Sequence, residues 1–299
     1  MAPPVIETES LTKRYGPVRG IEDVTMSVRA GEVFGFLGPN GAGKTTMIRT
    51  LLDLQRPTSG SARLFGLDSR GDSLAIRARL GNLPGDFTID AKLNGQELLR
   101  FCAQARGMTG LGRAAELAKR FEANLERPAG TLSRGNRQKI GLIQALSHDP
   151  ELLMLDEPTS GLDPLMQEEF LAVLSEHRDR GRTVFLSSHD LDEVERICDR
   201  VAIIRDGRIA AIEDVAEMRG RSYHRVTIEF AEPVDPAEFA HIPGVSDLAV
   251  DGRRVSFRVR GDLDTLVKAA ARHTVVDMEL VEPTLEEMFL TYYAGDQAA

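Results

Sequence analysis

A glycine-rich stretch near the N-terminus constrains the fold of this chain more than any other feature. Its residues fit the pattern G-x-x-x-x-G-K-[ST] and read Gly38, Pro39, Asn40, Gly41, Ala42, Gly43, Lys44 and Thr45. An expected strand at 32–37 precedes the stretch, and a helical run at 46–54 that begins with Thr46 follows it. This context lets backbone N–H groups and a helix N-terminus close around phosphate oxygens. The stretch therefore predicts an α/β fold with a phosphate-binding loop.

Two side chains of this loop have expected roles of their own. Lys44 would reach the β- and γ-phosphates of a nucleotide, and Thr45 would supply an oxygen to Mg²⁺. A second motif at 152–157 is an apolar strand that ends in Asp156 and Glu157. Asp156 suits Mg²⁺, directly or through water, and Glu157 is placed to polarise an attacking water. Two acids at a strand end can also be a solvated turn, but the phosphate loop favours a nucleotide site.

The order of expected elements divides the chain into two parts. From 1 to 220, β-rich and helical segments alternate, with strands expected at 32–37, 152–155 and 183–186, which predicts a mixed, largely parallel sheet. Helical periodicity at 93–146 predicts a helical subdomain at about 86–148. Residues 221–299 form a predicted small α+β domain. Its expected order β-α-β-β-α-β resembles the ferredoxin-like motif, with a tight turn at Asp251 and Gly252 and a closing helix at 284–293.

Composition limits the function classes. The chain has 299 residues, 42% of them hydrophobic, and a formal net charge of −9, so nucleic-acid binding is not expected as its main function. No apolar stretch approaches the roughly 20 residues that cross a bilayer, and the N-terminus does not resemble a signal peptide. The cysteines, Cys102 and Cys198, lack metal-ligand spacing and are expected to be reduced packing residues. These features predict a cytoplasmic protein whose membrane role, if any, depends on a partner.

A third motif makes the assignment specific. The stretch 132–138 reads Leu-Ser-Arg-Gly-Asn-Arg-Gln and resembles the signature Leu-Ser-Gly-Gly-Gln of the ABC family of P-loop ATPases. Ser133 and Gly135 match the family, whereas Arg134 and Asn136 depart from its commonest form. A serine-capped helix start would explain Ser133 but not the order of the surrounding motifs. The resemblance implies that this loop contacts ATP held by the opposite subunit of a dimer.

Further residues match the family in order. Residues 160–163, Ser-Gly-Leu-Asp, resemble the D-loop, and His189 resembles the switch histidine that senses the γ-phosphate. Tyr15 matches the aromatic residue that stacks on adenine. The family's Q-loop glutamine is missing, because Gly85 followed by Asp86 occupies its place. Glycine offers no side chain to Mg²⁺ or water, so either Asp86 substitutes or a water molecule fills the gap.

The resemblance covers about residues 5–220 and implies an ABC cassette that binds ATP and Mg²⁺. It also implies a homodimer of cassettes and a separate transmembrane permease subunit at the cytoplasmic face of the membrane. The tail at 281–290 resembles the C-terminus of ATPase subunits of antibiotic and multidrug exporters, although an amphipathic helix would explain the same residues. The sequence therefore predicts an ATPase that powers export of a drug, an antibiotic or a lipid-like compound. The alternatives are a soluble ABC ATPase acting on ribosomes or DNA, and a regulatory nucleotide-binding module that does not hydrolyse ATP.

Overall fold

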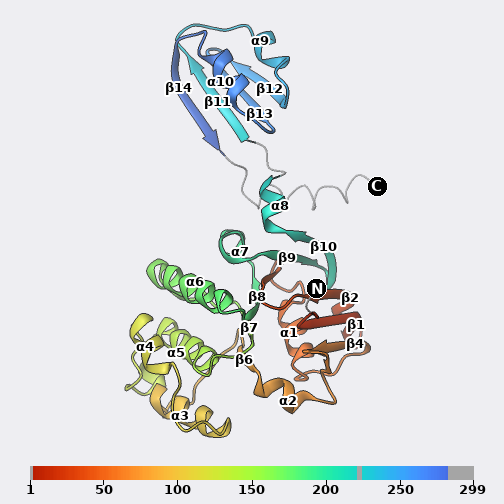
Figure 1. Cartoon of the computed structure of the whole chain (residues 1–299), viewed down its shortest axis with the longest axis vertical. Helices are drawn as coiled ribbons and strands as arrows, with labels where there is room; N and C mark the ends of the chain where they lie inside the picture. Colours follow the sequence, from red (N-terminus) through yellow and green to blue (C-terminus); the bar gives the residue numbers. More distant parts are fainter. Residues whose placement is uncertain (1–2, 221–223, 282–299) are drawn as a thin grey trace. The chain divides into compact units, whose positions relative to one another are not determined.

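The computed structural model of the chain describes residues 3–220 and 224–281. The chain divides into two compact units, Met1–Val215 and Ala216–Ala299, and each is described by itself. Figure 1 labels most elements of both units. The predicted domain boundary lies at residue 220, within the helix α8 (Val215–Gly220).

The first unit is built on a six-stranded sheet with the strand order β10-β9-β3-β8-β7-β6. Five of these strands, β9, β3, β8, β7 and β6, form four parallel pairs, and only β10 runs antiparallel to its neighbour β9. The strands are β3 (Val33–Leu37), β6 (Leu80–Leu83), β7 (Leu152–Asp156), β8 (Thr183–Ser188), β9 (Arg200–Arg205) and β10 (Arg208–Asp214). Every residue of β3, β7 and β8 is buried, as expected for strands covered on both faces. This sheet confirms the predicted α/β class.

A second, antiparallel sheet completes the core of this unit. Its order is β2-β1-β4-β5, with β1 (Ile6–Tyr15), β2 (Val18–Val28), β4 (Ser59–Leu64) and β5 (Leu67–Asp68). The helix α1 (Lys44–Leu51) lies between the two sheets, since its buried Met47, Ile48 and Leu51 share one apolar cluster with residues of both. Burial of α1 on two sides fixes the direction of the loop that precedes it.

The other helices of the unit are α2 (Ser73–Ala78), α3 (Gly95–Ala105), α4 (Ala114–Arg120), the short 3-10 helix η1 (Ala129–Thr131), α5 (Arg134–Leu146), α6 (Pro164–Asp179) and α7 (Leu191–Ile197). Residues 86–148, all of which the structure describes, contain α3, α4, η1 and α5 and no named strand. Figure 1 shows α3, α4 and α5 grouped together, to the left of and below β6 in that view. Asn94 starts α3 with a capping box in which its side chain and Glu97 each accept a backbone N–H. The helical content predicted for this segment is confirmed.

The second unit follows the predicted order of elements. It contains β11 (His224–Phe230), α9 (Ala237–Ala240), β12 (Val245–Asp251), β13 (Arg254–Val259), α10 (Asp264–Ala270) and β14 (Val275–Val281), in an antiparallel sheet of order β12-β13-β11-β14. The core of this unit includes Phe230, Phe239 and Phe257. The hairpin turn differs by one residue from the prediction, because Asp251 pairs with Arg254 and the turn is Gly252 and Arg253. Gly252 has φ 62°, which glycine adopts without strain. The helix predicted at 284–293 lies outside the described residues.

Candidate functional site

The phosphate-loop motif connects the end of β3 to the start of α1. Gly41 and Gly43 have φ values of 82° and 113°, in the left-handed region that favours glycine. A Cβ atom on Gly38 would lie 2.4 Å from the Ile204 carbonyl oxygen, and one on Gly43 would lie 2.5 Å from the Gly20 carbonyl oxygen. The loop can therefore close only with glycine at these positions.

The loop and the two acids are joined by side chains that are far apart in the sequence. Lys44 is buried; its Nζ donates to the Gly38 carbonyl oxygen at 2.7 Å and lies 3.1 Å from Glu157 Oε1. The Thr45 hydroxyl donates to Asp156 Oδ2 at 2.7 Å across 111 residues of sequence. The predicted residues of the two motifs thus form one site.

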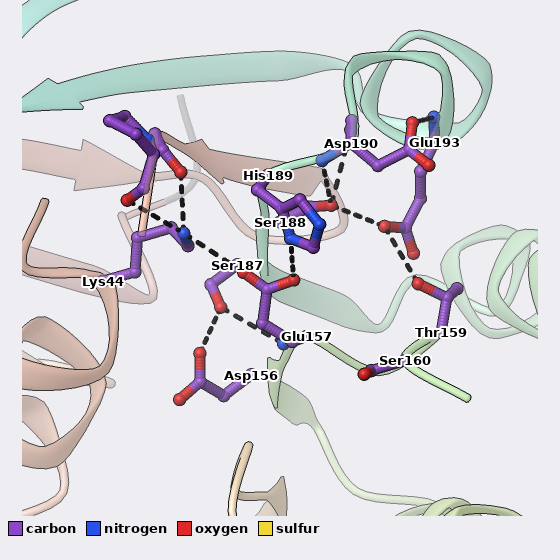
Figure 2. Close-up of polar contacts among 12 residues, drawn as sticks. Lys44, Asp156, Glu157, Thr159, Ser160, Ser187, Ser188, His189, Asp190 and Glu193 are labelled. Carbon is purple, nitrogen blue, oxygen red and sulfur yellow. Dashed lines mark hydrogen bonds and ion pairs between the residues drawn. The ribbon is translucent and has the colours of Figure 1, made fainter. Parts of the chain in front are cut away.

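Glu157 is held in an unusual backbone conformation at the end of β7. Its φ is 50°, in the left-handed region, which costs a residue other than glycine on the order of 1 kcal/mol or more. The Glu157 backbone N–H donates to the Ser187 carbonyl oxygen at 3.1 Å, and buried Gln138 donates to the Pro158 carbonyl oxygen at 2.8 Å. His189 Nδ1 lies 2.5 Å from Glu157 Oε2, so Glu157 contacts Lys44 on one side and His189 on the other (Figure 2).

A hollow of about 280 Å³ opens over the loop. Its predicted lining residues are Tyr15, Asn40, Gly41, Gly43, Lys44, Thr45, Thr46 and Glu157. Val18, Arg19 and Gly20 of β2 also line it and were not predicted, because nothing in their local sequence marks them. The Tyr15 side chain is half-exposed, and the Lys13 ammonium lies 5.2 Å from the centre of its ring. The hollow thus combines an aromatic face with a phosphate-type loop.

The residues of the predicted signature loop lie elsewhere. Ser133 caps α5 by accepting the Asn136 N–H at 3.1 Å, and neither Ser133 nor Gly135 lines the hollow of its own chain. A Cβ on Gly135 would lie 2.5 Å from the Gly161 carbonyl oxygen. Arg134 Nη2 donates to Ser160 Oγ at 2.7 Å. The structure thus brings the signature loop against the D-loop segment of the same chain.

The position without the family's glutamine is tightly packed. A Cβ on Gly85 would lie 3.1 Å from Asp156 Oδ2, so Gly85 lies directly beside the carboxylate of the predicted metal site. The neighbouring Asp86 pairs with Arg49 of α1 at 2.8 Å. In this structure, the Asp86 carboxylate is therefore engaged by Arg49.

The available donors fit Mg²⁺ only together with a bound phosphate. Among residues 3–220 and 224–281, no group of three His, Cys, Asp or Glu side chains could hold a metal ion. Mg²⁺ commonly binds one or two carboxylates, water and substrate phosphates. The Thr45 hydroxyl and the Asp156 carboxylate, which are already in contact, match that donor set.

Three supporting residues were missed from the sequence. Ser187 donates to Asp156 Oδ1 through a short hydrogen bond, and Gln138 binds the backbone after Glu157. Glu193 of α7 is buried close to the ends of β7 and β8. Its burial and, to a smaller extent, the nearby charges of Asp190 and Glu157 raise its pKa from 4.5 to about 7. These roles depend on tertiary contacts. Gln138 ends the signature-like stretch 132–138, but that pattern assigned its side chain no role, and no local pattern marks Ser187 or Glu193.

Comparisons with known proteins define the class of this protein. Residues 21–160 match the ABC transporter family, and residues 214–293 match the family described as ATP-binding protein DrrA1-3-like, C-terminal domain. A solved structure of the ATP binding subunit of an ABC transporter is 30% identical, with a TM-score of 0.67 over 72% of this chain and 92% of that chain. These matches agree with the fold and with the order of motifs.

Relatives of known description extend the comparison. The bacitracin transport ATP-binding protein BcrA of Enterococcus faecalis is 35% identical over 73% of this chain and 72% of its own length. The daunorubicin/doxorubicin resistance ATP-binding protein DrrA of Streptomyces peucetius is 33% identical over 95% of this chain and 91% of its own length. The chain belongs to the ATP-binding proteins of the ABC transporter family. Within the part of the chain that the structure describes, no helix has the length and apolar character needed to cross a membrane.

Proposed function

We propose that the chain hydrolyses ATP as the energy-supplying cassette of a membrane exporter. The observation that carries this proposal is the set of contacts beside the phosphate loop. Glu157 lies between the Lys44 ammonium and the His189 imidazole, and the Thr45 and Asp156 side chains meet next to it. This arrangement supplies a base, two groups for phosphate oxygens and a site for Mg²⁺ in and directly beside the hollow over the loop.

In the proposed reaction, ATP binds with its phosphates in the loop. Glu157 orients a water molecule and accepts its proton while the water oxygen attacks the γ-phosphorus. The bond between the γ-phosphorus and the bridging oxygen breaks, and ADP and phosphate are the products. Lys44 and His189 stabilise the charge on the transferring group, so catalysis depends on positioning and electrostatics. Lys44 must turn from Glu157 toward the phosphates, which frees the carboxylate for water.

The remaining site residues have proposed binding roles. Thr45 and Asp156 would hold Mg²⁺, which neutralises phosphate charge when it is bound. Tyr15 would stack on adenine, and the backbone of the loop, including Pro39, Ala42 and Thr46, would enclose the phosphates. Ser133 and Gly135, which do not line the hollow of their own chain, would contact ATP in the opposite subunit of a head-to-tail homodimer. The different affinity of ATP and ADP for closed and open dimers would couple hydrolysis to transport.

The exporter assignment is supported by the relatives. BcrA and DrrA are described as bacitracin transport and daunorubicin/doxorubicin resistance proteins, and their similarity favours an antibiotic or a drug as cargo. A lipid-like compound is the third cargo class that we propose. We propose a separate transmembrane permease as partner, with this chain peripheral at the cytoplasmic face of the membrane. Residues 1–220 would be the ATPase domain, with its helical part at about 86–148. Residues 221–299 would form an accessory domain.

The proposal is tested by phosphate release and light scattering on the full chain with Glu157→Gln and Lys44→Ala. Glu157→Gln should lower turnover by about 100-fold or more, because it removes the base, while ATP binding and ATP-dependent dimerisation remain. Lys44→Ala should weaken ATP binding itself by about 10-fold or more. Equal loss of ATP binding in both variants would contradict the assigned roles.

The permease partner needs a separate test. Purification of the full chain from membranes should recover a transmembrane protein rather than ribosomes or DNA. Recovery with ribosomes or DNA would instead support a soluble ATPase. ATP binding without turnover, even with the permease present, would support a regulatory module.

A further inference from the structure

Glu193 is a buried acidic residue beside the proposed site and has no role in the reaction described above. It lies in the first turn of α7, and its side chain is only 6% exposed. Its Oε2 atom accepts a hydrogen bond from Ser188 Oγ at 2.7 Å and another from Thr159 Oγ1 at 3.4 Å. Among the described residues, Oε1 has no hydrogen-bond partner.

The two hydroxyl partners lie on different segments of the chain, as Figure 2 shows. Ser188 is the last residue of β8 and directly precedes His189. Thr159 lies two residues after Glu157, beyond the end of β7. The Glu193 carboxyl group therefore joins the backbone that carries His189 to the backbone that carries Glu157.

The position of Glu193 is itself fixed. The Asp190 side chain caps α7 by accepting the N–H groups of Asp192 at 3.0 Å and of Glu193 at 3.2 Å. The Asp190 backbone N–H also donates to Ser188 Oγ at 3.0 Å. The Asp190 backbone and the Glu193 carboxyl group therefore bind the same Ser188 hydroxyl and hold α7 against the end of β8.

We propose that Glu193 is a positioning residue of the hydrolytic site, whose carboxyl group holds the segments of Glu157 and His189 at the separation that lets their side chains meet. Its effect on turnover rests on the proposed ATPase function. Its effect on the contact between Glu157 and His189 does not depend on that function.

The groups around the buried Glu193 side chain favour a polar bridge at this place. A buried carboxyl group without a cationic partner is costly, and an apolar side chain would fill the same space more cheaply. The acidic groups Asp190 and Glu157 face Glu193, and the buried Cys198 thiol lies close enough to be affected by its charge. Because these neighbours and burial disfavour the ionised form, a neutral carboxyl group or its amide analogue would serve as the bridge.

The first test compares Glu193→Ala and Glu193→Gln in the full chain, by phosphate release for kcat and KM and by fluorescent ATP-analogue binding for Kd. Glu193→Ala should lower kcat by about 10-fold or more while Kd changes less than about 3-fold, because the phosphate loop is untouched. Glu193→Gln keeps an acceptor for Ser188 and Thr159 and should stay within about 3-fold of wild type. Asp192→Asn, on the exposed side of α7, is the matched control.

Three outcomes would overturn the proposal. Wild-type kcat in Glu193→Ala would show that the bridge is not needed. Parallel losses of kcat and ATP affinity would indicate a general structural defect. Equal impairment of both variants would show that the negative charge matters rather than the bridge. If Glu193→Ala does not fold, Thr159→Val removes one arm of the bridge and should also lower kcat selectively; an unchanged kcat would count against the bridge.

A second measurement does not depend on catalysis. The ring resonance of His189, assigned with His189→Gln in histidine-labelled full chain, should move in Glu193→Ala and stay near its wild-type position in Glu193→Gln. An unmoved resonance in Glu193→Ala would refute the bridge, whatever the activity. A moved resonance in a chain whose wild type has no turnover, even with the permease present, would support the bridge and reject the proposed ATPase function.

Discussion

The buried Glu193 carboxyl group should make the stability of the first unit fall as pH rises. Burial raises the pKa of Glu193 from 4.5 to about 7 in the folded chain. The folded state therefore keeps a proton that the unfolded state has already lost in this pH range. The stabilisation is complete below pH 4.5 and is lost as pH rises through about 7.

The size of the effect follows from the linkage of proton binding to unfolding. One pH unit between the folded and unfolded pKa corresponds to about 1.4 kcal/mol, so the full loss is about 3 kcal/mol. Little of this should be screened by solvent, because the side chain is 6% exposed. Glu193→Gln mimics the neutral form at every pH. The unfolding free energy of Glu193→Gln minus that of wild type should therefore increase by about 3 kcal/mol from the acidic to the alkaline end of the range.

The assay is urea unfolding of the full chain at a series of pH values spanning about 4.5 to 8. The chain contains no tryptophan, so far-UV circular dichroism is the suitable signal. If the two units unfold separately, the transition that moves with the substitution belongs to the unit that holds α7. Asp192→Asn removes the same formal charge from an exposed position on the same helix and should keep the pH dependence of wild type.

The reasoning would be refuted by parallel stability curves for wild type and Glu193→Gln over the whole pH range. That result would mean that Glu193 takes up no proton on folding, because water reaches its side chain or because the Asp190 cap of α7 is rearranged. A constant offset between the curves has another cause, because the amide places an N–H₂ donor where Oε1 has no partner, and this costs about 1 to 3 kcal/mol at any pH.

Two further substitutions have clear expected outcomes. Burial lowers the pKa of His177 from 6.5 to about 4, so the unfolding free energy of wild type should fall by about 2 kcal/mol between pH 7 and pH 5, whereas that of His177→Leu should not. Calorimetry near pH 5 and pH 7 checks this, and equal pH dependence of the two proteins would contradict it. Gly135→Ala places a Cβ 2.5 Å from the Gly161 carbonyl oxygen and should destabilise the chain by about 1 to 3 kcal/mol and weaken ATP-dependent dimerisation. Gly110→Ala, with open space around it, is the control; equal effects of the two alanines on urea unfolding would contradict the steric argument.

The features of the fold that could be predicted were those with a strong local pattern. The glycine loop fixed one strand before it and one helix after it, and β7 was visible as an apolar run ending in two acids. The antiparallel sheet of β1, β2 and β4 was not assigned as a separate layer. Its strands are interrupted by register shifts between β1 and its two neighbours, which break the regular alternation that marks a strand.

Which site residues could be predicted from the sequence has the same physical explanation. Lys44, Thr45, Asp156 and Glu157 could be identified because their motifs imply where the side chains point, and the structure brings them together. Glu193 could not, since nothing local distinguishes it from the exposed Asp192 one residue before it. Only the packing of α7 against β3 and β8 buries one acid and leaves the other in water.

The three buried or half-buried carboxyl groups of the site have different partners, and this difference separates their proposed work. Asp156 accepts hydrogen bonds from the hydroxyls of Thr45 and Ser187, which leaves its charge available to a metal ion. Glu157 lies between Lys44 and His189, so a shift of Lys44 toward phosphate would release it to a water molecule. Glu193 has hydroxyl partners, and burial raises its pKa to about 7, so below that pH it joins two segments without adding a third negative charge. A third ionised carboxylate at this place would repel the same phosphate groups that the loop attracts. In our proposal, the proton on Glu193 therefore complements the charges of Asp156 and Glu157.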